Sequence, residues 1–168
     1  MIDRMNLLFT GASGFLGYNV LPLLKKKYSV ETIGLTSQDD YIVNLAAEIP
    51  KLAGKYDVIL HVAGKAHSLP KTEAEKRLFF DVNLQGTKNL CTALEQSGIP
   101  KSFIFISTVA VYGCDSGENI TEEYPLNGTT PYALSKIKAE KYLEEWCAMH
   151  NVKLSILRPS LIAGPNPP

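Results

Sequence analysis

Apolar and polar residues follow two distinct patterns along this chain. Short apolar runs predict strands over Asn6–Thr10, Val30–Leu35, Tyr41–Leu45, Val58–Val62, Phe103–Ser107 and Lys153–Leu157. Apolar residues at three- and four-residue spacing predict helices over Phe15–Tyr28, Lys71–Gln96 and Pro131–His150. Several of the strands are continuously apolar, which is typical of parallel strands covered by helices on both faces. The pattern therefore predicts an α/β fold built on a doubly wound parallel sheet.

These elements extend over the whole chain of 168 residues, of which 45% are hydrophobic and 20% are charged. This length and composition predict one globular domain, residues 1–168, with a single core. Gly98 and Pro100 are expected to end the long middle helix. The polar, turn-rich stretch from Gly113 to Thr130 is expected to form a surface loop.

Charge and cysteine content narrow the classes of function. Lys plus Arg and Asp plus Glu number 17 each, so no net field attracts nucleic acid or an acidic membrane. The three cysteines are odd in number and widely spaced, which argues against a disulfide framework and against a zinc site. No apolar run is long enough for a signal-peptide core or a membrane span. We therefore expect a cytoplasmic protein with no metal, nucleic-acid or membrane partner.

The first predicted strand leads directly into a glycine-rich turn and then into a helix. Residues 10–17 read TGASGFLG, which places three glycines at GxxGxxG spacing. Glycine lets the backbone turn sharply and approach a pyrophosphate, and the helix start supplies free amide groups for the anion. The turn predicts a Rossmann-type dinucleotide site that includes Gly11, Ser13, Gly14, Phe15, Leu16 and Gly17.

The choice between NAD and NADP depends on the tip of the second strand. An acidic side chain there would accept hydrogen bonds from the adenosine ribose. Thr36 stands at this tip and cannot repel a 2′-phosphate, yet no Arg or Lys lies nearby to attract one. Asp39 and Asp40 follow two or three residues late. Both cofactors stay open at this point, with NAD slightly favoured.

A tyrosine and a lysine lie four residues apart at the start of the last predicted helix. This spacing places Tyr132 and Lys136 on one helical face. A free tyrosine titrates near pH 10, so acid/base use near neutral pH needs its anion stabilised, and a nearby ammonium group does this. Ser107 and Thr108 follow the fifth strand at the carboxyl end of the sheet, where ligands of such folds bind. A hydroxyl there can bind a substrate oxygen.

With these motifs in this order, the chain resembles the extended short-chain dehydrogenase/reductases, and within them the NAD-dependent epimerase/dehydratase family. The resemblance rests on TGASGFLG at 10–17, HVAG at 61–64, VNLQGT at 82–87, the stretch from Ser107 to Gly113, the Tyr132–Lys136 pair, LRP at 157–159 and Gly164-Pro165. It covers essentially all of the chain.

The resemblance implies roles for single residues. The catalytic Ser/Thr of the family falls on Thr108, with Ser107 supporting it, and the catalytic tyrosine and lysine fall on Tyr132 and Lys136. Lys136 would also hold the nicotinamide ribose. Further cofactor contacts fall on Thr36, Asn44, Leu45, Ala63, Gly64 and Asn83.

Some positions depart from the family pattern and bear on the reaction. Val109 and Ala110 stand where the dehydratases of the family carry an Asp-Glu pair that helps to eliminate water. This favours a nucleotide-sugar 4-epimerase, with a 4-keto sugar reductase as the nearest alternative and a non-catalytic dinucleotide sensor as an alternative of another class. Asn44 replaces a usual aspartate near the adenine, and Leu161 replaces a substrate-contacting asparagine, which leaves the sugar open.

The resemblance also bears on chain length and assembly. Relatives continue beyond the equivalent of Pro168 into a smaller substrate-binding region, so we expect that region to be absent here. Relatives also pair through the two long helices, which implies a homodimer.

Three other sets of residues have a simpler explanation than a binding site. His61 and His67 have no third ligand beside them, and the fourth strand can hold a partly buried imidazole. Lys25–Lys27 end a predicted helix, where cations complement the helix dipole. Tyr142 and Trp146 are spaced for packing or for a dimer face.

Overall fold

The centre of the structure is a single parallel sheet. The structure is a computed structural model that describes residues 4–66, 69–114 and 116–165. In this part of the chain the sheet has six strands in the order β3-β2-β1-β4-β5-β6, and every neighbouring pair is parallel. The strands are β1 Asn6–Thr10, β2 Ser29–Gly34, β3 Tyr41–Ile42, β4 Val58–His61, β5 Ser102–Ile106 and β6 Lys153–Leu157. The predicted doubly wound parallel sheet is confirmed.

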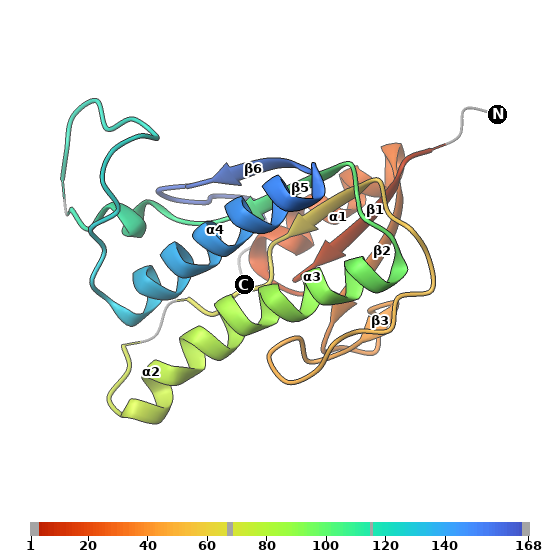
Figure 1. The fold of residues 1–168 in the computed structure, drawn as a ribbon, viewed down its shortest axis with the longest axis horizontal. Helices are drawn as coiled ribbons and strands as arrows, with labels where there is room; N and C mark the ends of the chain where they lie inside the picture. Colours follow the sequence, from red (N-terminus) through yellow and green to blue (C-terminus); the bar gives the residue numbers. More distant parts are fainter. Residues whose placement is uncertain (1–3, 67–68, 115, 166–168) are drawn as a thin grey trace.

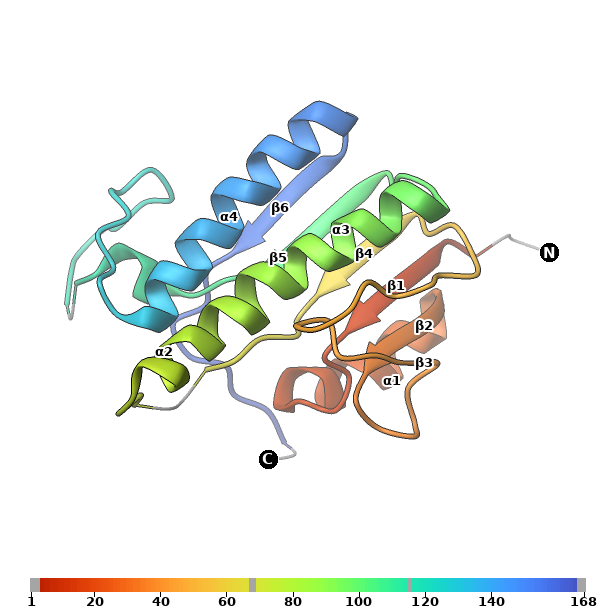
Figure 2. The same cartoon turned by 60° about the horizontal axis from the view of Figure 1, so that its bottom comes forward.

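Helices cover both faces of this sheet. Helix α1, Phe15–Lys27, lies behind the strands in Figure 1, while α3, Gly86–Ser97, and α4, Pro131–His150, lie side by side in front of them. Figure 2 shows α2, Glu73–Phe80, continuing the line of α3 beyond the edge of the sheet. This division follows from right-handed crossovers, because β1 connects in one direction along the sheet and β4 connects in the other.

The long middle helix is not regular along its length. The sequence predicts one helix over 71–96, whereas the structure has α2, then a π-helical turn η1 over Asp81–Gln85, then α3. The start of α2 is fixed by a capping box, in which Thr72 and Glu75 bond each other's backbone N–H. Helix α3 ends at Gly98, whose backbone φ of 140° is rarely adopted by residues that carry a side chain. The predicted stop at Gly98 is therefore confirmed, and the π turn is an addition that the apolar spacing does not reveal.

Helix α4 has the bounds predicted for it. The Thr130 hydroxyl accepts a hydrogen bond from the Ala133 N–H, and Pro131 occupies the first turn, where its missing N–H costs nothing. Asn151 ends the helix in the left-handed conformation, with φ 55°. The two catalytic candidates on this helix thus lie in its first two turns, at the end that faces the carboxyl edge of the sheet.

Two short elements differ from the sequence prediction. Strand β3 ends at Ile42 rather than at Leu45, because after the Val43 N–H bonds the Gly34 carbonyl the chain turns at Asn44. A 3₁₀ helix, η2, over Val109–Tyr112 follows β5 within a stretch where the sequence predicts no helix. Its left-handed cap at Gly113 leads into the predicted surface loop, which contains neither helix nor strand in its described residues.

The core lies between the sheet and the α3–α4 layer. Leu8, Ile59, Phe103 and Phe105 project from the strands against Leu90, Leu94, Leu143 and Trp146 of the helices. Trp146 is buried, and its indole N–H donates to Glu95, which confirms the packing role predicted for it. The last turn of α1 carries Lys25–Lys27 as expected. Within the described ranges, no helix is long and apolar enough to cross a membrane.

A buried ion pair joins α4 to the end of β6. The Glu140 side chain is 0% exposed and that of Arg158 13%, and their closest N–O distance is 2.7 Å. Arg158 also donates to the Tyr112 hydroxyl and to the Glu122 carbonyl, and the Ser107 hydroxyl donates to Glu140. The Glu140 hydrogen bond raises the pKa of Arg158, so the guanidinium remains charged. This pair connects the ends of two strands, the last helix and the surface loop.

Replacing Glu140 by Gln should destabilise the fold strongly, because it leaves the buried Arg158 charge without its counter-charge. Loss of one partner of a buried pair costs about 3–5 kcal/mol. Urea unfolding monitored by circular dichroism measures this cost. Glu73→Gln breaks the exposed Lys76–Glu73 pair and is the matched control, which should move the midpoint little. If both substitutions changed the unfolding midpoint equally, the Tyr112 hydroxyl and the Glu122 carbonyl would be sufficient partners for the Arg158 guanidinium.

Candidate functional site

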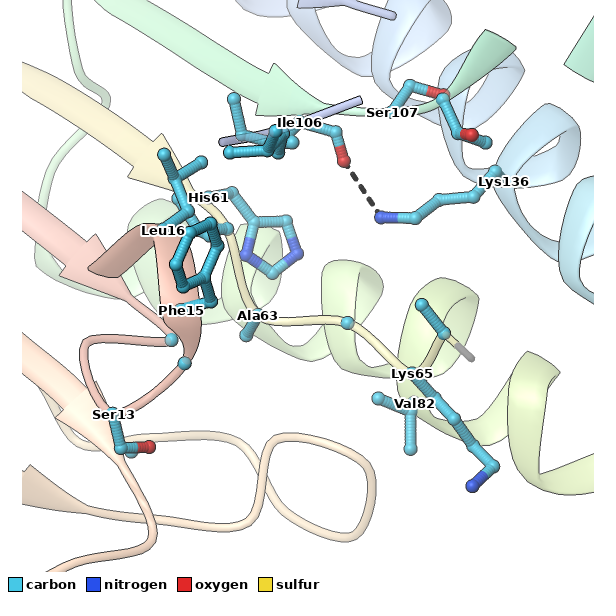
Figure 3. A pocket seen from close by; sticks show the side chains of 18 of the residues that line it. Ser13, Phe15, Leu16, His61, Ala63, Lys65, Val82, Ile106, Ser107 and Lys136 are labelled. Atoms are coloured by element: carbon cyan, nitrogen blue, oxygen red, sulfur yellow. Dashed lines mark hydrogen bonds between the residues drawn. The ribbon is translucent and has the colours of Figure 1, made fainter. Parts of the chain in front are cut away.

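A cavity of about 990 Å³ opens at the carboxyl ends of the strands. Figure 3 shows Phe15 and Leu16 from the glycine turn on one side of it and Lys136 from α4 on the other, with His61 and Ala63 at the end of β4 between them. Ligands of open α/β sheets bind at this edge, where the strand order reverses. The reversal here lies between β1 and β4.

The glycine turn brings β1 and α1 close to β4. Gly11 has φ 81°, and a Cβ built on it would lie 2.7 Å from the Ala63 nitrogen. A Cβ on Gly17 would lie 2.3 Å from the Gly11 carbonyl oxygen, so α1 could not pack as closely with any larger residue there. Gly14 caps α1 without a side-chain hydrogen bond. The first-turn amide groups are therefore not occupied by a capping side chain and can bind an anion.

Most of the predicted cofactor residues line this cavity, but three do not. Its lining includes Gly11, Ser13, Gly14, Phe15, Leu16, Asn44, Leu45, Ala63, Gly64, Thr108, Tyr132 and Lys136. Gly17, Thr36 and Asn83 are not part of the lining. Gly17 serves the packing of α1 instead, and the other two residues hold neighbouring segments in place.

Thr36 is bonded to Asp39 at the end of β2. Its N–H and its hydroxyl both donate to one carboxylate oxygen of Asp39, at 3.1 and 2.7 Å. Asp39 follows the strand tip by several residues, but the chain turns back so that its carboxylate lies next to Gly34. A Cβ built on Gly34 would lie only 2.3 Å from Asp39 Oδ2. A buried negative charge thus lies beside the end of the second strand, which sequence spacing alone does not reveal.

Asn83 holds the wall of the cavity rather than facing into it. Its side-chain oxygen accepts from the Lys65 N–H at 2.7 Å, and its amide nitrogen donates to the Lys65 carbonyl at 3.1 Å and to the Ser135 hydroxyl at 2.9 Å. These bonds fix the segment after β4 against α4. A Cβ on Gly64 would lie 3.1 Å from both the Asn83 oxygen and Lys136 Nζ, so glycine allows this close approach.

The three catalytic candidates meet at one end of the cavity. Thr108 follows β5 and caps η2, with its hydroxyl accepting from the Ala110 N–H at 3.2 Å. Its side chain also interacts with the Tyr132 phenol and acts to lower the pKa of that group. Lys136 lies one turn further along α4, and its ammonium group donates to the Ile106 carbonyl at 2.8 Å, drawn as a dashed line in Figure 3. The spacing of the pair on α4 therefore does bring both residues to the cavity wall.

The electrostatics of these residues follow from their burial. Burial lowers the pKa of Lys136 to about 8, although Glu140 acts in the opposite direction. Burial raises the pKa of Tyr132 and outweighs the lowering effect of its hydrogen bond to Thr108. The sequence predicts a pKa lowered by Lys136, so the direction found here is the opposite, because desolvation of the phenol is the larger effect.

Ser107 and Thr108 have different partners, although they are neighbours. The Ser107 hydroxyl donates to the buried Glu140 carboxylate. Thr108 is left as the hydroxyl beside Tyr132. This difference favours Thr108 over Ser107 for contact with a substrate oxygen, in line with the choice made from the sequence.

Several residues of the cavity wall are not among the site residues predicted from the sequence. His61 is 1% exposed rather than partly buried, and its ring nitrogens lie within hydrogen-bond distance of the Thr10 and Thr87 hydroxyls. His67 lies outside the described residues. The segment 159–164 also lines the cavity, and its place after the sixth strand is the signal that could have identified it. In the described ranges, no three metal-binding side chains come together.

Comparison with known proteins places this fold and motif set in a family. The sequence pattern of the NAD dependent epimerase/dehydratase family matches residues 7–168. An N-acetyl-alpha-D-glucosaminyl-diphospho-ditrans,octacis-undecaprenol 4-epimerase from Escherichia coli O157:H7 is 33% identical, over 95% of this chain and 49% of its own length. A UDP-glucose 4-epimerase from Vibrio cholerae is 31% identical, over 95% of this chain and 52% of its own length.

A solved structure is also similar. The UDP-glucose 4-epimerase of Thermus thermophilus in complex with NAD aligns with a TM-score of 0.75 and 26% identity, over 92% of this chain and 54% of that one. The chain thus spans about half the length of the curated relatives it matches. On the match over residues 7–168, this chain belongs to the NAD dependent epimerase/dehydratase family.

Proposed function

We propose that this chain is the cofactor-binding and catalytic half of an NAD-dependent enzyme that epimerises a nucleotide-linked sugar at C4. One observation carries the proposal: Thr108 and Tyr132, whose side chains interact, and Lys136 one turn further along α4 line the same cavity as the glycine turn. The 4-epimerase relatives support the choice of reaction. The homodimer expected from the resemblance and the cytoplasmic location expected from the cysteine content remain part of the proposal.

The residues of the cavity fit a dinucleotide. Gly11 leaves no room for a side chain between the turn and β4, and the first turn of α1 lacks a capping side chain, as a pyrophosphate contact requires. Ser13, Gly14, Phe15 and Leu16 would hold the phosphates, and Asn44 and Leu45 the adenosine. Gly64, Tyr132 and Lys136 would hold the nicotinamide ribose. Bound NAD supplies the hydride acceptor and donor that no side chain provides.

In the proposed reaction, Tyr132 removes the proton of the sugar C4 hydroxyl and later returns it. Thr108 shares a hydrogen bond with the same oxygen. Because burial raises the pKa of Tyr132, its deprotonation depends on positive charge close to the phenol. Lys136, with its pKa lowered to about 8, still carries most of its charge at neutral pH and would supply this positive charge. The Ile106 carbonyl holds the ammonium group in place.

Replacing Tyr132 by Phe should lower turnover by about 10²- to 10⁴-fold, because the proton acceptor is lost. The affinity for NAD should change little, since the ring and most of the cavity wall remain. Turnover is measured with a nucleotide sugar in the longest natural chain that contains these residues, and affinity by calorimetry. Tyr142→Phe on the same helix is the control and should keep full turnover. Unchanged output of Tyr132→Phe would favour a non-catalytic sensor.

The 168-residue chain should bind NAD more tightly than NADP, because the Asp39 carboxylate beside Gly34 repels a 2′-phosphate. Calorimetric titration with each cofactor measures the preference. Asp39→Asn should reduce it, whereas Asp40→Asn removes a charge whose carboxylate bonds Thr32 and should change it less. Equal or tighter binding of NADP to the native chain would contradict this assignment. Failure of both cofactors to bind a folded sample would contradict the proposed function.

The epimerase should interconvert two C4 epimers without net consumption of cofactor. A 4-keto reductase with the same residues would instead consume reduced cofactor in proportion to product. Absorbance of the reduced nicotinamide, followed beside chromatographic analysis of the sugar, distinguishes the two reactions. Elimination of water is disfavoured, because Val109 and Ala110 of η2 offer no carboxylate next to Thr108. Stoichiometric loss of reduced cofactor would favour the reductase.

A further inference from the structure

His61 is a buried, titratable residue that the proposed chemistry does not use. It ends β4 and stacks on Phe105, with ring centroids 5.6 Å apart. Its Nδ1 lies 2.7 Å from the Thr10 hydroxyl oxygen, and its Nε2 lies 3.0 Å from the Thr87 hydroxyl oxygen. Both ring nitrogens thus have one buried partner each.

The partners of Thr87 determine where the ring proton lies. The Thr87 hydroxyl has one hydrogen, which it donates to the Asn83 carbonyl at 2.7 Å. Toward His61 it can therefore only accept, so the proton of the ring lies on Nε2. Burial lowers the pKa of His61 to about 3, and the nearby charge of Lys136 acts in the same direction. The ring is neutral at physiological pH, and its Nδ1 is an acceptor.

The partners of Thr10 agree with this assignment. The Thr10 hydroxyl oxygen accepts from the Ala63 N–H at 3.1 Å, and its hydrogen is free to donate to Nδ1. The hydrogen bonds then run from the Ala63 N–H to Thr10, from Thr10 to His61, from His61 to Thr87, and from Thr87 to the backbone carbonyl of Asn83. Each donor in this series has one acceptor. Every hydrogen bond in this buried series has a fixed direction, and no polar atom in it is left without a partner.

The two ends of this series lie at the two halves of the site. Thr10 directly precedes Gly11 and the phosphate-binding turn. At the other end, the Asn83 side chain donates to the Ser135 hydroxyl at 2.9 Å, and Ser135 donates to the Tyr132 carbonyl at 2.7 Å. Two sets of hydrogen bonds, linked through the covalent frame of Asn83, therefore join the turn expected to hold the cofactor to the backbone of the tyrosine expected to transfer the proton.

We infer that His61 is a positioning residue that fixes the phosphate-binding turn relative to the start of α4, through a ring proton held on Nε2. Histidine suits this position because a neutral imidazole offers one acceptor and one donor on opposite sides of a rigid ring. An apolar residue of similar size would leave the Thr10 hydroxyl hydrogen without an acceptor and would remove the donor to the Thr87 hydroxyl oxygen. The consequence for catalysis rests on the proposed function, whereas the placement of the proton does not.

Nitrogen NMR of the ¹⁵N-labelled 168-residue chain tests the proton placement directly. Long-range correlations between ring protons and ring nitrogens distinguish Nε2–H from Nδ1–H. His61 should keep its proton on Nε2 and stay neutral between about pH 5.5 and 8.5. A proton on Nδ1, or a second ring proton anywhere in this range, would overturn the inference. This measurement needs no cofactor and no activity.

Two substitutions separate the two ends of the series. His61→Gln can still donate to Thr87 but loses the acceptor for Thr10. It should weaken NAD binding by roughly tenfold while the Tyr132 amide signal stays in place. His61→Asn can still accept from Thr10 but loses the donor to Thr87. It should keep NAD affinity and shift the Tyr132 amide signal.

A purely structural role for His61 predicts a different result. Both variants would then lose stability and NAD affinity together, with the same amide signals disturbed in each, and that outcome would overturn the inference. If a variant does not fold, the tautomer measurement on the native chain decides instead. If the native chain binds no NAD, the proposed function fails, while the amide signals still report whether the two ends are coupled.

Discussion

The site depends on one topological constraint, which is the reversal of strand order between β1 and β4. Because α1 leaves the end of β1 toward one face and the chain after β4 leaves toward the other, the two connections diverge and open a crevice above the neighbouring strands. Gly11 allows β1 to turn within contact distance of Ala63, so the crevice has a narrow floor made of backbone.

The walls of the crevice are built from polar groups that would be costly to bury alone. Lys136, His61 and Glu140 are each almost fully buried, and each has at least one hydrogen-bond partner. A core selected only for stability would replace such groups with apolar residues, because buried ion pairs add little net stability. What they add is orientation: Glu140 holds Arg158 and Ser107, and the Ile106 carbonyl holds Lys136. The reacting groups are thereby positioned before any ligand arrives.

The sequence predicts those features that depend on local spacing. The glycine turn, the bounds of α4 and the shared face of Tyr132 and Lys136 follow from the order of residues over a few turns of chain. It does not predict features that depend on contacts between distant segments. Asp39 reaches Gly34 only because the loop after β2 folds back, and the partners of His61 come from β1 and α3. The raised pKa of Tyr132 depends on how deeply the ring is buried, which no local pattern encodes.

The proposed role of Thr108 rather than Ser107 rests on how the fold separates two neighbouring hydroxyl residues. Two neighbouring hydroxyl residues follow β5, and both have their partners on α4. Ser107 points to the buried carboxylate of α4, whereas Thr108 points to Tyr132. The Ser107 hydroxyl is engaged by Glu140, and the Thr108 hydroxyl is the one proposed to contact substrate. The choice therefore depends on the position of Glu140, one turn beyond Lys136 on the same helix face. Helix α4 thus carries the tyrosine, the lysine beside it and the carboxylate that decides which hydroxyl joins them.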